Sequence, residues 1–255
     1  GFAEYASTIG GVTLYTVFTP LFGLLVMWLF AFKAGWFPLG KFLDPLVWRE
    51  ASVDANHVFN NMLITAAAAA VMLLVASIVL SRLGTRRRSL VLAVGGIVAV
   101  AAMVASWSIS GTGYLAVDII KHMVLPVATL TLISFGGTML LTRNSMLETM
   151  REDYVLAARA KGLSDRQVRN RHVARNALLP IVTSFVFSLA FAIDGGVIIE
   201  QVFSWPGMGL TLVDAASNED LPLAVGAFVF VGFFALAAHL AADILYAVLD
   251  PRVRY

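Results

Sequence analysis

The chain is organised around RNSMLETMREDYVLAARAKGLSDRQVRNRHVARNALLP, residues 143–180. This is the only long polar stretch in an otherwise apolar sequence, and it is crowded with Arg and Lys. Apolar runs long enough to cross a bilayer lie on both sides of it. Because basic loops are retained on the cytoplasmic side of a membrane, we expect residues 143–177 to form a cytoplasmic loop between two crossings.

The pattern within this loop predicts two short helices around a break. Residues 152–161 are good helix formers, with acidic residues in the first turn and basic residues in the last, as the helix dipole favours. Gly162 stands where a left-handed C-terminal cap is expected. Ser164 is then expected to cap a second helix, residues 165 to about 176, in a capping box with Gln167.

The first of these helices is expected to present Tyr154, Ala157 and Ala158 on one side. One interpretation is a knob that fits a groove of a partner protein. The other is an interfacial loop whose basic residues contact anionic lipid headgroups. Composition alone leaves both interpretations open.

The composition indicates an all-α, polytopic transmembrane helical bundle. The 255 residues are 59% hydrophobic and 13% charged, whereas soluble domains are roughly 45–50% apolar and about 25% charged. A net charge of +2 gives no indication of a nucleic-acid partner, and the absence of Cys excludes disulfides and thiol chemistry. Residue 1 is Gly, so we expect a processed or trimmed start, and no signal peptide is apparent.

Six membrane crossings are expected from the apolar runs. They cover residues of about 11–32, 61–80, 89–109, 118–142, 178–203 and 223–249. Pro20 predicts a kink within the first crossing, and Pro126 is expected in the first turns of the fourth.

Charge predicts which loops lie on which side of the membrane. The basic residues at 82–88, in the 143–177 loop and at 252–254 are all placed on the cytoplasmic side by one orientation, with both chain termini cytoplasmic. Residues 41–60 are mixed and polar, and residues 204–221 carry no Lys or Arg, so both are expected to be external loops. Pro206-Gly207 in the second of these is a type II turn signal.

The run EDYVLAARAKGLSDRQVRNRHVARNALLP resembles the coupling loop of ATP-binding-cassette (ABC) importer permeases, in the branch that imports dipeptides, oligopeptides and nickel. The family's Ala-Ala-x-x-x-Gly core and its later Leu-Pro are matched in this run. The resemblance implies ATPase-coupling roles for Asp153, Tyr154, Ala157, Ala158, Arg159, Ala160, Lys161, Gly162, Leu163, Ser164, His172, Asn176, Leu179 and Pro180.

A second run, VIIEQVFSWPGMG at residues 197–209, resembles the same family's Glu-x-x-Phe-x-x-Pro-Gly-x-Gly segment. It marks a candidate translocation or outer-gate set: Asp194, Glu200, Phe203, Pro206, Gly207 and Gly209. Asp194 and Glu200 are either functional intramembrane acids or acids that reach the outer interface, and the sequence leaves this open.

The resemblance covers residues 11–40 and 118–255. Residues 45–116 are expected to be a family-atypical insertion with a two-helix hairpin, whose role stays open. The two spans that come first in the family are not found before residue 11, so those N-terminal spans are either missing or were never present.

The resemblance implies the permease subunit of an importer for peptides or similar small solutes in the inner membrane. The sequence has no Gly-x-x-x-x-Gly-Lys-Ser/Thr phosphate loop, so the chain itself is expected to be no enzyme and to bind no cofactor. ATP and Mg would be held by partner subunits. The implied partners are two ABC ATPase subunits, a second homologous permease subunit, an extracytoplasmic solute-binding protein and membrane lipid.

Parts of the sequence are compatible with two other function classes. An ion- or proton-coupled secondary carrier would use Asp194, Glu200, His239 and Asp243 as a relay. A membrane enzyme is disfavoured because neither His-Glu-x-x-His nor Gly-x-Ser-x-Gly occurs, which leaves only the scattered Ser108, Ser110 and His122. His57 and His122 each stand alone, so no metal site is expected. The substrate cannot be read from the sequence.

Overall fold

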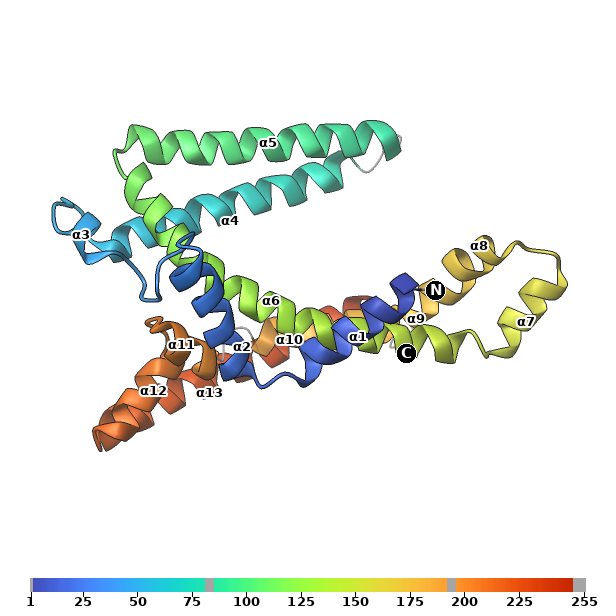
Figure 1. The fold of residues 1–255 in the computed structure, drawn as a ribbon. Coiled ribbons are helices and arrows are strands. Elements are labelled where there is room, and N and C mark those ends of the chain that lie inside the picture. The colour runs from blue at the N-terminus through green and yellow to red at the C-terminus, as the bar shows by residue number, and fades with distance from the viewer. Residues whose placement is uncertain (1, 81–84, 192–195, 250–255) are drawn as a thin grey trace. The chain divides into compact units, whose positions relative to one another are not determined.

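A computed structural model of the chain describes residues 2–80, 85–191 and 196–249. Within those ranges the regular structure is helical throughout, with no strand (Figure 1). The predicted all-α membrane fold class is therefore confirmed. The chain divides into two compact units, one made of Gly1–Gly40 with Leu125–Tyr255 and the other of Lys41–Val124.

The first unit opens with α1 (Phe2–Thr16), α2 (Thr19–Val26) and the π-helix η1 (Met27–Lys33). The axis bends by 108° between Thr8–Thr16 and Thr19–Lys33. Where the sequence predicts a kink at Pro20, the structure has a helix break just before that proline. That proline lies in the first turn of α2 instead, where its missing N–H leaves no helical hydrogen bond unmade.

The long helix α6 (Gly113–Thr149) carries the boundary between the two units. Its 37 residues would extend about 55 Å at 1.5 Å per residue, well beyond a hydrocarbon core of about 30 Å. It starts earlier and ends later than the predicted 118–142 crossing. Pro126 therefore lies inside the helix, whereas the sequence predicts it in the first turns. A membrane helix tolerates such a proline because neighbouring groups re-satisfy the freed carbonyl.

Helices α1 and α6 approach closely at a pair of glycines. A Cβ atom placed on Gly136 would lie 2.9 Å from the carbonyl oxygen of Gly11, and one placed on Gly11 would lie 2.8 Å from the Met139 sulfur. At Gly136 only hydrogen lets the two backbones come this near, as in other membrane helix pairs with small residues, whereas a side chain at Gly11 would press on the flexible Met139 side chain. The N-terminal helix is thus seated on the second half of α6.

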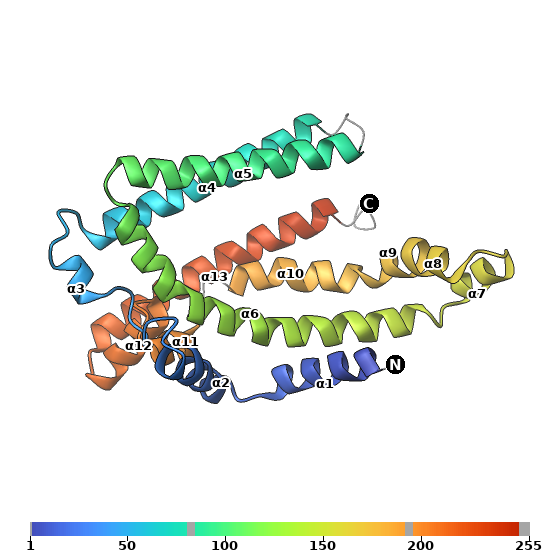
Figure 2. The ribbon, with the colours of Figure 1, turned by 45° about the horizontal axis from the view of Figure 1, so that its top comes forward.

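The C-terminal part of the first unit contains α10 (Leu179–Phe191), α11 (Val197–Phe203), α12 (Met208–Ser217) and α13 (Leu221–Leu249). The predicted 178–203 crossing is described as two helices, α10 and α11, on either side of residues 192–195, which lie outside the described ranges. The predicted 204–221 loop contains the short helix α12, which the sequence analysis did not indicate. Both α10 and α12 pack along α13 (Figure 2).

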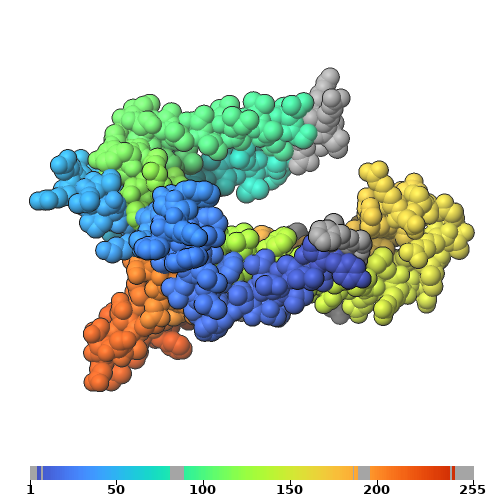
Figure 3. All heavy atoms as spheres, in the orientation of Figure 1, coloured from blue at the N-terminus to red at the C-terminus, as the bar shows by residue number. Residues whose placement is uncertain are grey.

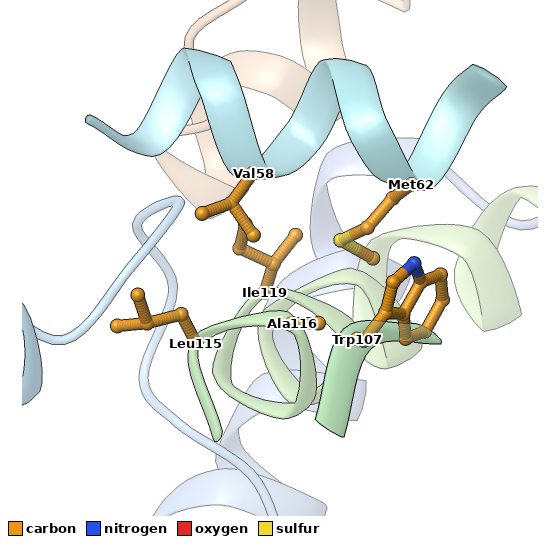
Figure 4. Packing of buried hydrophobic residues seen from close by; sticks show 6 residues of the cluster. All are labelled: Val58, Met62, Trp107, Leu115, Ala116 and Ile119. Carbon is orange, nitrogen blue, oxygen red and sulfur yellow. The ribbon is translucent and has the colours of Figure 1, made fainter. Parts of the chain in front are cut away.

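The second unit contains α3 (Pro45–Trp48), α4 (Ala55–Val79), α5 (Thr85–Ile109) and the first turns of α6. The prediction of a polar loop at 41–60 was correct only in part, because α3 and the start of α4 fall within it. Helices α4 and α5 form a hairpin, and the core that secures it consists of Val58, Met62, Trp107, Leu115, Ala116 and Ile119 (Figure 4).

Asp118 of α6 makes the main polar tie in this unit. Its Oδ2 accepts the backbone N–H of Asp44 at 3.0 Å and the indole N–H of Trp48 at 2.8 Å. Asp118 therefore holds the α3 segment beside α6. The side chain is 11% exposed, and a shielded carboxylate of this kind requires such donors.

Four helices in the described ranges are long and apolar enough to cross a membrane, or five if the bent α1–α2 pair counts as one crossing. The four are Ala55–Val79, Ser89–Ile109, Gly113–Thr149 and Leu221–Ala241. Of the other two expected crossings, 11–32 overlaps the bent pair, and 178–203 comprises α10, α11 and residues that lie outside the described ranges.

Candidate functional site

The loop between α6 and α10 folds into four short helical segments. These are α7 (Asp153–Ala160), α8 (Asp165–Gln167), the π-helix η3 (Val168–Val173) and α9 (Ala174–Ala177). Because α6 continues to Thr149, the first residues of the predicted 143–177 loop belong to that helix instead. In the space-filling view the α7–α9 residues gather in one lobe (Figure 3).

Helix α7 ends as the sequence predicts. Gly162 has a φ of +76°, in the left-handed region. The N–H of Gly162 donates to the carbonyl of Arg159 at 2.9 Å, and the N–H of Leu163 donates to the carbonyl of Ala158 at 3.4 Å. These two bonds form a Schellman motif, which satisfies carbonyls that the end of a helix leaves free. The predicted glycine cap is confirmed.

The second helix starts at the predicted capping box. Gln167 Oε1 accepts the backbone N–H of Ser164 at 3.1 Å and its hydroxyl at 3.0 Å. The predicted helix of 165–176 is observed as α8, η3 and α9 in succession, so its middle turns are wider than those of an α-helix. The capping box and the helical run of about 165–176 are thus confirmed, and the π-helical middle is what the sequence did not indicate.

The loop has a hydrophobic core of its own. Val155 and Ala158 of α7 are buried against Val168 and Val173 of η3. Met146, Met150 and Leu163 pack around this cluster. The predicted common face of Tyr154, Ala157 and Ala158 is therefore corrected. Ala158 is only 5% exposed because it follows Val155 at a spacing of i, i+3 and shares its inward face. Of the three residues, Tyr154 and Ala157 are exposed.

Two hydrogen bonds close the loop. Asn176 Nδ2 donates to the hydroxyl of Tyr154 at 2.8 Å, and Ser145 Oγ of α6 donates to the carbonyl of Ala177 at 2.8 Å. The structure thus brings together Tyr154 and Asn176, which the sequence only placed in the same loop. Ser145 was missed because a serine near the end of a long helix carries no signal for a partner 32 positions away.

The predicted coupling residues lie on this element or directly after it. Arg159 approaches Asp165 at 3.8 Å, but both side chains are well exposed, so the pair contributes little. Leu179 and Pro180 lie outside the lobe, in the first turn of α10. The exposed members of the set are Asp153, Tyr154, Ala157, Arg159, Ala160, Lys161, Gly162, Ser164, Leu179 and Pro180, and the half-buried ones are Leu163, His172 and Asn176.

The predicted outer-gate set centres on α11 and α12. Phe203 is 1% exposed and is buried with Val26, Ala31, Leu125 and Ile199. A Cβ atom on Gly40, whose φ is +77°, would lie 2.8 Å from the Phe203 carbonyl oxygen. Phe203 is therefore a core residue that joins α11 to the α2–η1 segment. Asp194 lies outside the described residues.

Glu200 has a defined partner. Its Oε2 accepts the backbone N–H of Leu210, in the first turn of α12, at 2.9 Å. A Cβ atom on Gly207 would overlap the Glu200 carboxylate, and one on Gly209 would lie 3.0 Å from Oε2 and 2.6 Å from the Cα of Val197. The spacing of Glu and glycines in this motif thus places a carboxylate at the N-terminus of a helix, where it is stabilised by the backbone N–H groups.

The turn between these helices differs from the prediction. Gly207 has a φ of −124°, which excludes the positive φ that a type II turn needs at that position. Ser204 takes the left-handed conformation instead, with a φ of +50°. The N–H of Trp205 donates to the carbonyl of Glu200 at 2.7 Å, which gives a Schellman-type end to α11.

Residues 7–255 match the family described as "Binding-protein-dependent transport system inner membrane component". The chain belongs to this family. Its members are transport components of the inner membrane, which agrees with the apolar helices described above.

Relatives within this family carry peptide-transport names. The chain is 40% identical over 138 residues to the oligopeptide transport system permease protein AppB of Bacillus subtilis (strain 168), covering 54% of this chain and 44% of that protein. It is 40% identical over 138 residues to the di/tripeptide transport system permease protein DppB of Pseudomonas aeruginosa (strain UCBPP-PA14), covering 54% and 41%. The match thus spans less than half the length of these relatives.

Three of the four residues considered for a proton or ion relay are described in the structure. Glu200 is bonded to α12, His239 Nδ1 lies 2.8 Å from the carbonyl oxygen of Ala235 on its own helix, and Asp243 is exposed. Across the described ranges, no three His, Asp or Glu side chains gather as a metal-binding group. The fourth relay candidate, Asp194, lies outside the described residues, and the family match supports the permease interpretation and not the carrier.

The three residues considered for a hydrolase, Ser108, Ser110 and His122, each lie within hydrogen-bond distance of a nearby backbone carbonyl. Ser108 Oγ donates to the carbonyl of Val104 at 2.9 Å, and Ser110 Oγ donates to that of Trp107 at 3.0 Å. His122 Nδ1 lies 2.8 Å from the carbonyl oxygen of Asp118 in its own helix. Hydrogen bonds of this kind, from a side chain to a nearby backbone carbonyl, are ordinary in helices and turns. They do not pair either serine with His122 as a nucleophile with its base.

Proposed function

We propose that this chain is the permease subunit of an ABC importer for peptides or similar small solutes. It would form part of the translocation pathway and couple to separate ATPase subunits. The single observation that carries the proposal is the α7–α9 lobe, a loop with its own core that keeps Tyr154 and Ala157 on its exposed face. The printed names of AppB and DppB support peptides as the substrate class.

The lobe has the properties that a mechanical coupling element needs. A flexible loop would absorb the motion of a partner, whereas a packed lobe transmits it, because close-packed interiors are not continuously deformable. The Ser145–Ala177 bond ties the lobe to the end of α6, and α9 leads directly into α10. A displacement of α7 would therefore reach two helices of the first unit.

Energy would come from partner subunits. The sequence contains no phosphate loop of the Gly-x-x-x-x-Gly-Lys-Ser/Thr type. The proposed assembly accordingly has two ATPase subunits that hold ATP and Mg, a second homologous permease subunit and an extracytoplasmic solute-binding protein. No cofactor is proposed for this chain, and both of its ends are proposed to be cytoplasmic on the basis of the basic clusters.

The absence of Cys gives a direct test of the coupling role. Ala157→Cys places one thiol on the exposed face of α7, and Arg166→Cys places one on the exposed side of α8. In membranes that contain the whole assembly, a short thiol-to-amine crosslinker is expected to join position 157 to an ATPase subunit. Position 166 is the matched control on the same lobe and is expected to react less.

The crosslink is then read beside function. Ala157→Trp should abolish ATP-driven uptake while the chain remains in the membrane, because Ala157 is exposed and its replacement leaves the lobe core intact. Normal ATP-driven uptake by Ala157→Trp, together with no ATPase crosslink at position 157, would refute the coupling role.

A further inference from the structure

The family-like segment at residues 197–209 contains one acid, and the structure assigns it a task. We propose that Glu200 is a positioning residue of the translocation pathway and not an ion carrier. Its carboxylate holds α12 against α11, so that the two helices move as one block during transport. This inference rests on the proposed function, because the motion in question is that of a permease.

Helix α12 begins without a side chain of its own that could cap it. Gly207 occupies the N-cap position and has no side chain with which to accept the free N–H groups of the first turn. Glu200 supplies the missing acceptor from α11, through the 2.9 Å bond from the Leu210 N–H to Oε2. Helix α12 therefore depends on a residue outside itself for its cap, and that residue fixes its position relative to α11.

The Glu200 carboxylate lies close against Gly207 and Gly209. The overlap of a Gly207 Cβ with the carboxylate means that any side chain there would expel Glu200 from its place. Gly209 is buried, and a Cβ atom placed on it would point into Val197 of α11. The glycines thus create the space that the acid fills, and the two helices are in backbone contact there.

The block formed by α11 and α12 contacts two other parts of the first unit. A Cβ atom on Gly23 of α2 would lie 3.1 Å from Val202 and 3.5 Å from the Phe203 ring. On the other side α12 packs along α13, with Ala215 only 1% exposed. The block therefore lies between the segment that follows the 108° break and the last long helix. Motion of either would be passed to the other through the contact between α11 and α12.

The test separates a hydrogen-bond acceptor from a proton carrier. Glu200→Gln keeps a carbonyl oxygen that can accept the Leu210 N–H, whereas Glu200→Ala removes it. In purified assembly reconstituted in liposomes with its binding protein and a peptide, Glu200→Gln should retain most of the peptide uptake per ATP hydrolysed. Glu200→Ala should lower that ratio by roughly fivefold or more, the population factor expected from losing one helix cap, with basal ATP hydrolysis per complex unchanged.

A second variant removes the donor instead of the acceptor. Leu210→Pro deletes the N–H, and proline is tolerated in the first turn of a helix. It should lower uptake per ATP as Glu200→Ala does, and the double variant should be no worse than either one, since both remove the same bond.

Three results would overturn the proposal. They are a Glu200→Gln variant as inactive as Glu200→Ala, a normal ratio in Glu200→Ala, and losses that only follow the amount of assembled complex. Failure of the proposed function itself has a different signature, because the unmodified assembly would then show no ATP-dependent peptide uptake.

Discussion

Replacement of Gly162 tests whether the fold of the α7–α9 lobe governs coupling. This glycine has a φ of +76°, and a Cβ atom added to it would meet nothing within 4 Å. The effect of Gly162→Ala is therefore purely conformational, about 1–2 kcal/mol for an L-residue in the left-handed region. Gly162→Asn should cost less, since Asn visits this region more readily, and β-branched Gly162→Val should cost more.

This strain should appear as weaker protection of the lobe backbone. The Schellman bonds at Gly162 and Leu163 hold α7 closed over the core, so opening them exposes the amides of α7. Hydrogen exchange of α7 amides should accelerate by roughly fivefold to thirtyfold in Gly162→Ala, and uptake per ATP should fall in the order Gly, Asn, Ala, Val.

A matched control is available in the same unit. Gly35 has a φ of +65° and equally open surroundings, so Gly35→Ala introduces the same strain away from the lobe. It should leave α7 exchange unchanged. Unchanged exchange in Gly162→Ala, or equal losses in the Asn and Val variants, would refute the reasoning.

Three further predictions concern contacts made across the fold. Ser145→Ala removes the hydroxyl bonded to α9, which should cost about 0.5–1.5 kcal/mol and speed exchange in α9 but not in α13. Gly136→Val should block the approach of α1 to α6 and lower the yield of folded chain in detergent, whereas Gly226→Val, in open space, should express normally. Phe203→Ala should lower the thermal midpoint of the purified complex through a loss of about 3–5 kcal/mol. Phe233→Ala, at a side chain 67% exposed, should leave that midpoint nearly unchanged.

Local rules predicted the loop well. The Gly162 cap and the Ser164–Gln167 capping box follow from residues within one helical turn of each other, and both are observed. The two prolines show where such rules stop. Pro20 was expected to kink a helix and instead follows a break, while Pro126 was expected near a helix start and lies inside α6. Where a helix begins depends on packing elsewhere as much as on the proline itself.

The sequence by itself determined the membrane class, the family and the chemistry of the helix ends in the loop. These properties come from hydropathy summed over a run or from bonds between near neighbours, so no knowledge of the rest of the fold is required. The same holds for the basic clusters from which orientation is proposed, because charge acts through composition.

Only the tertiary structure decided what the polar residues do. The sequence did not show that Glu200 caps α12, that Ser145 bonds to α9 or that the core covering Ala158 comes from η3. Each of these depends on which segments meet after folding. A side chain's partner is set by the path of the whole chain, and patterns between sequence neighbours carry no information about that path.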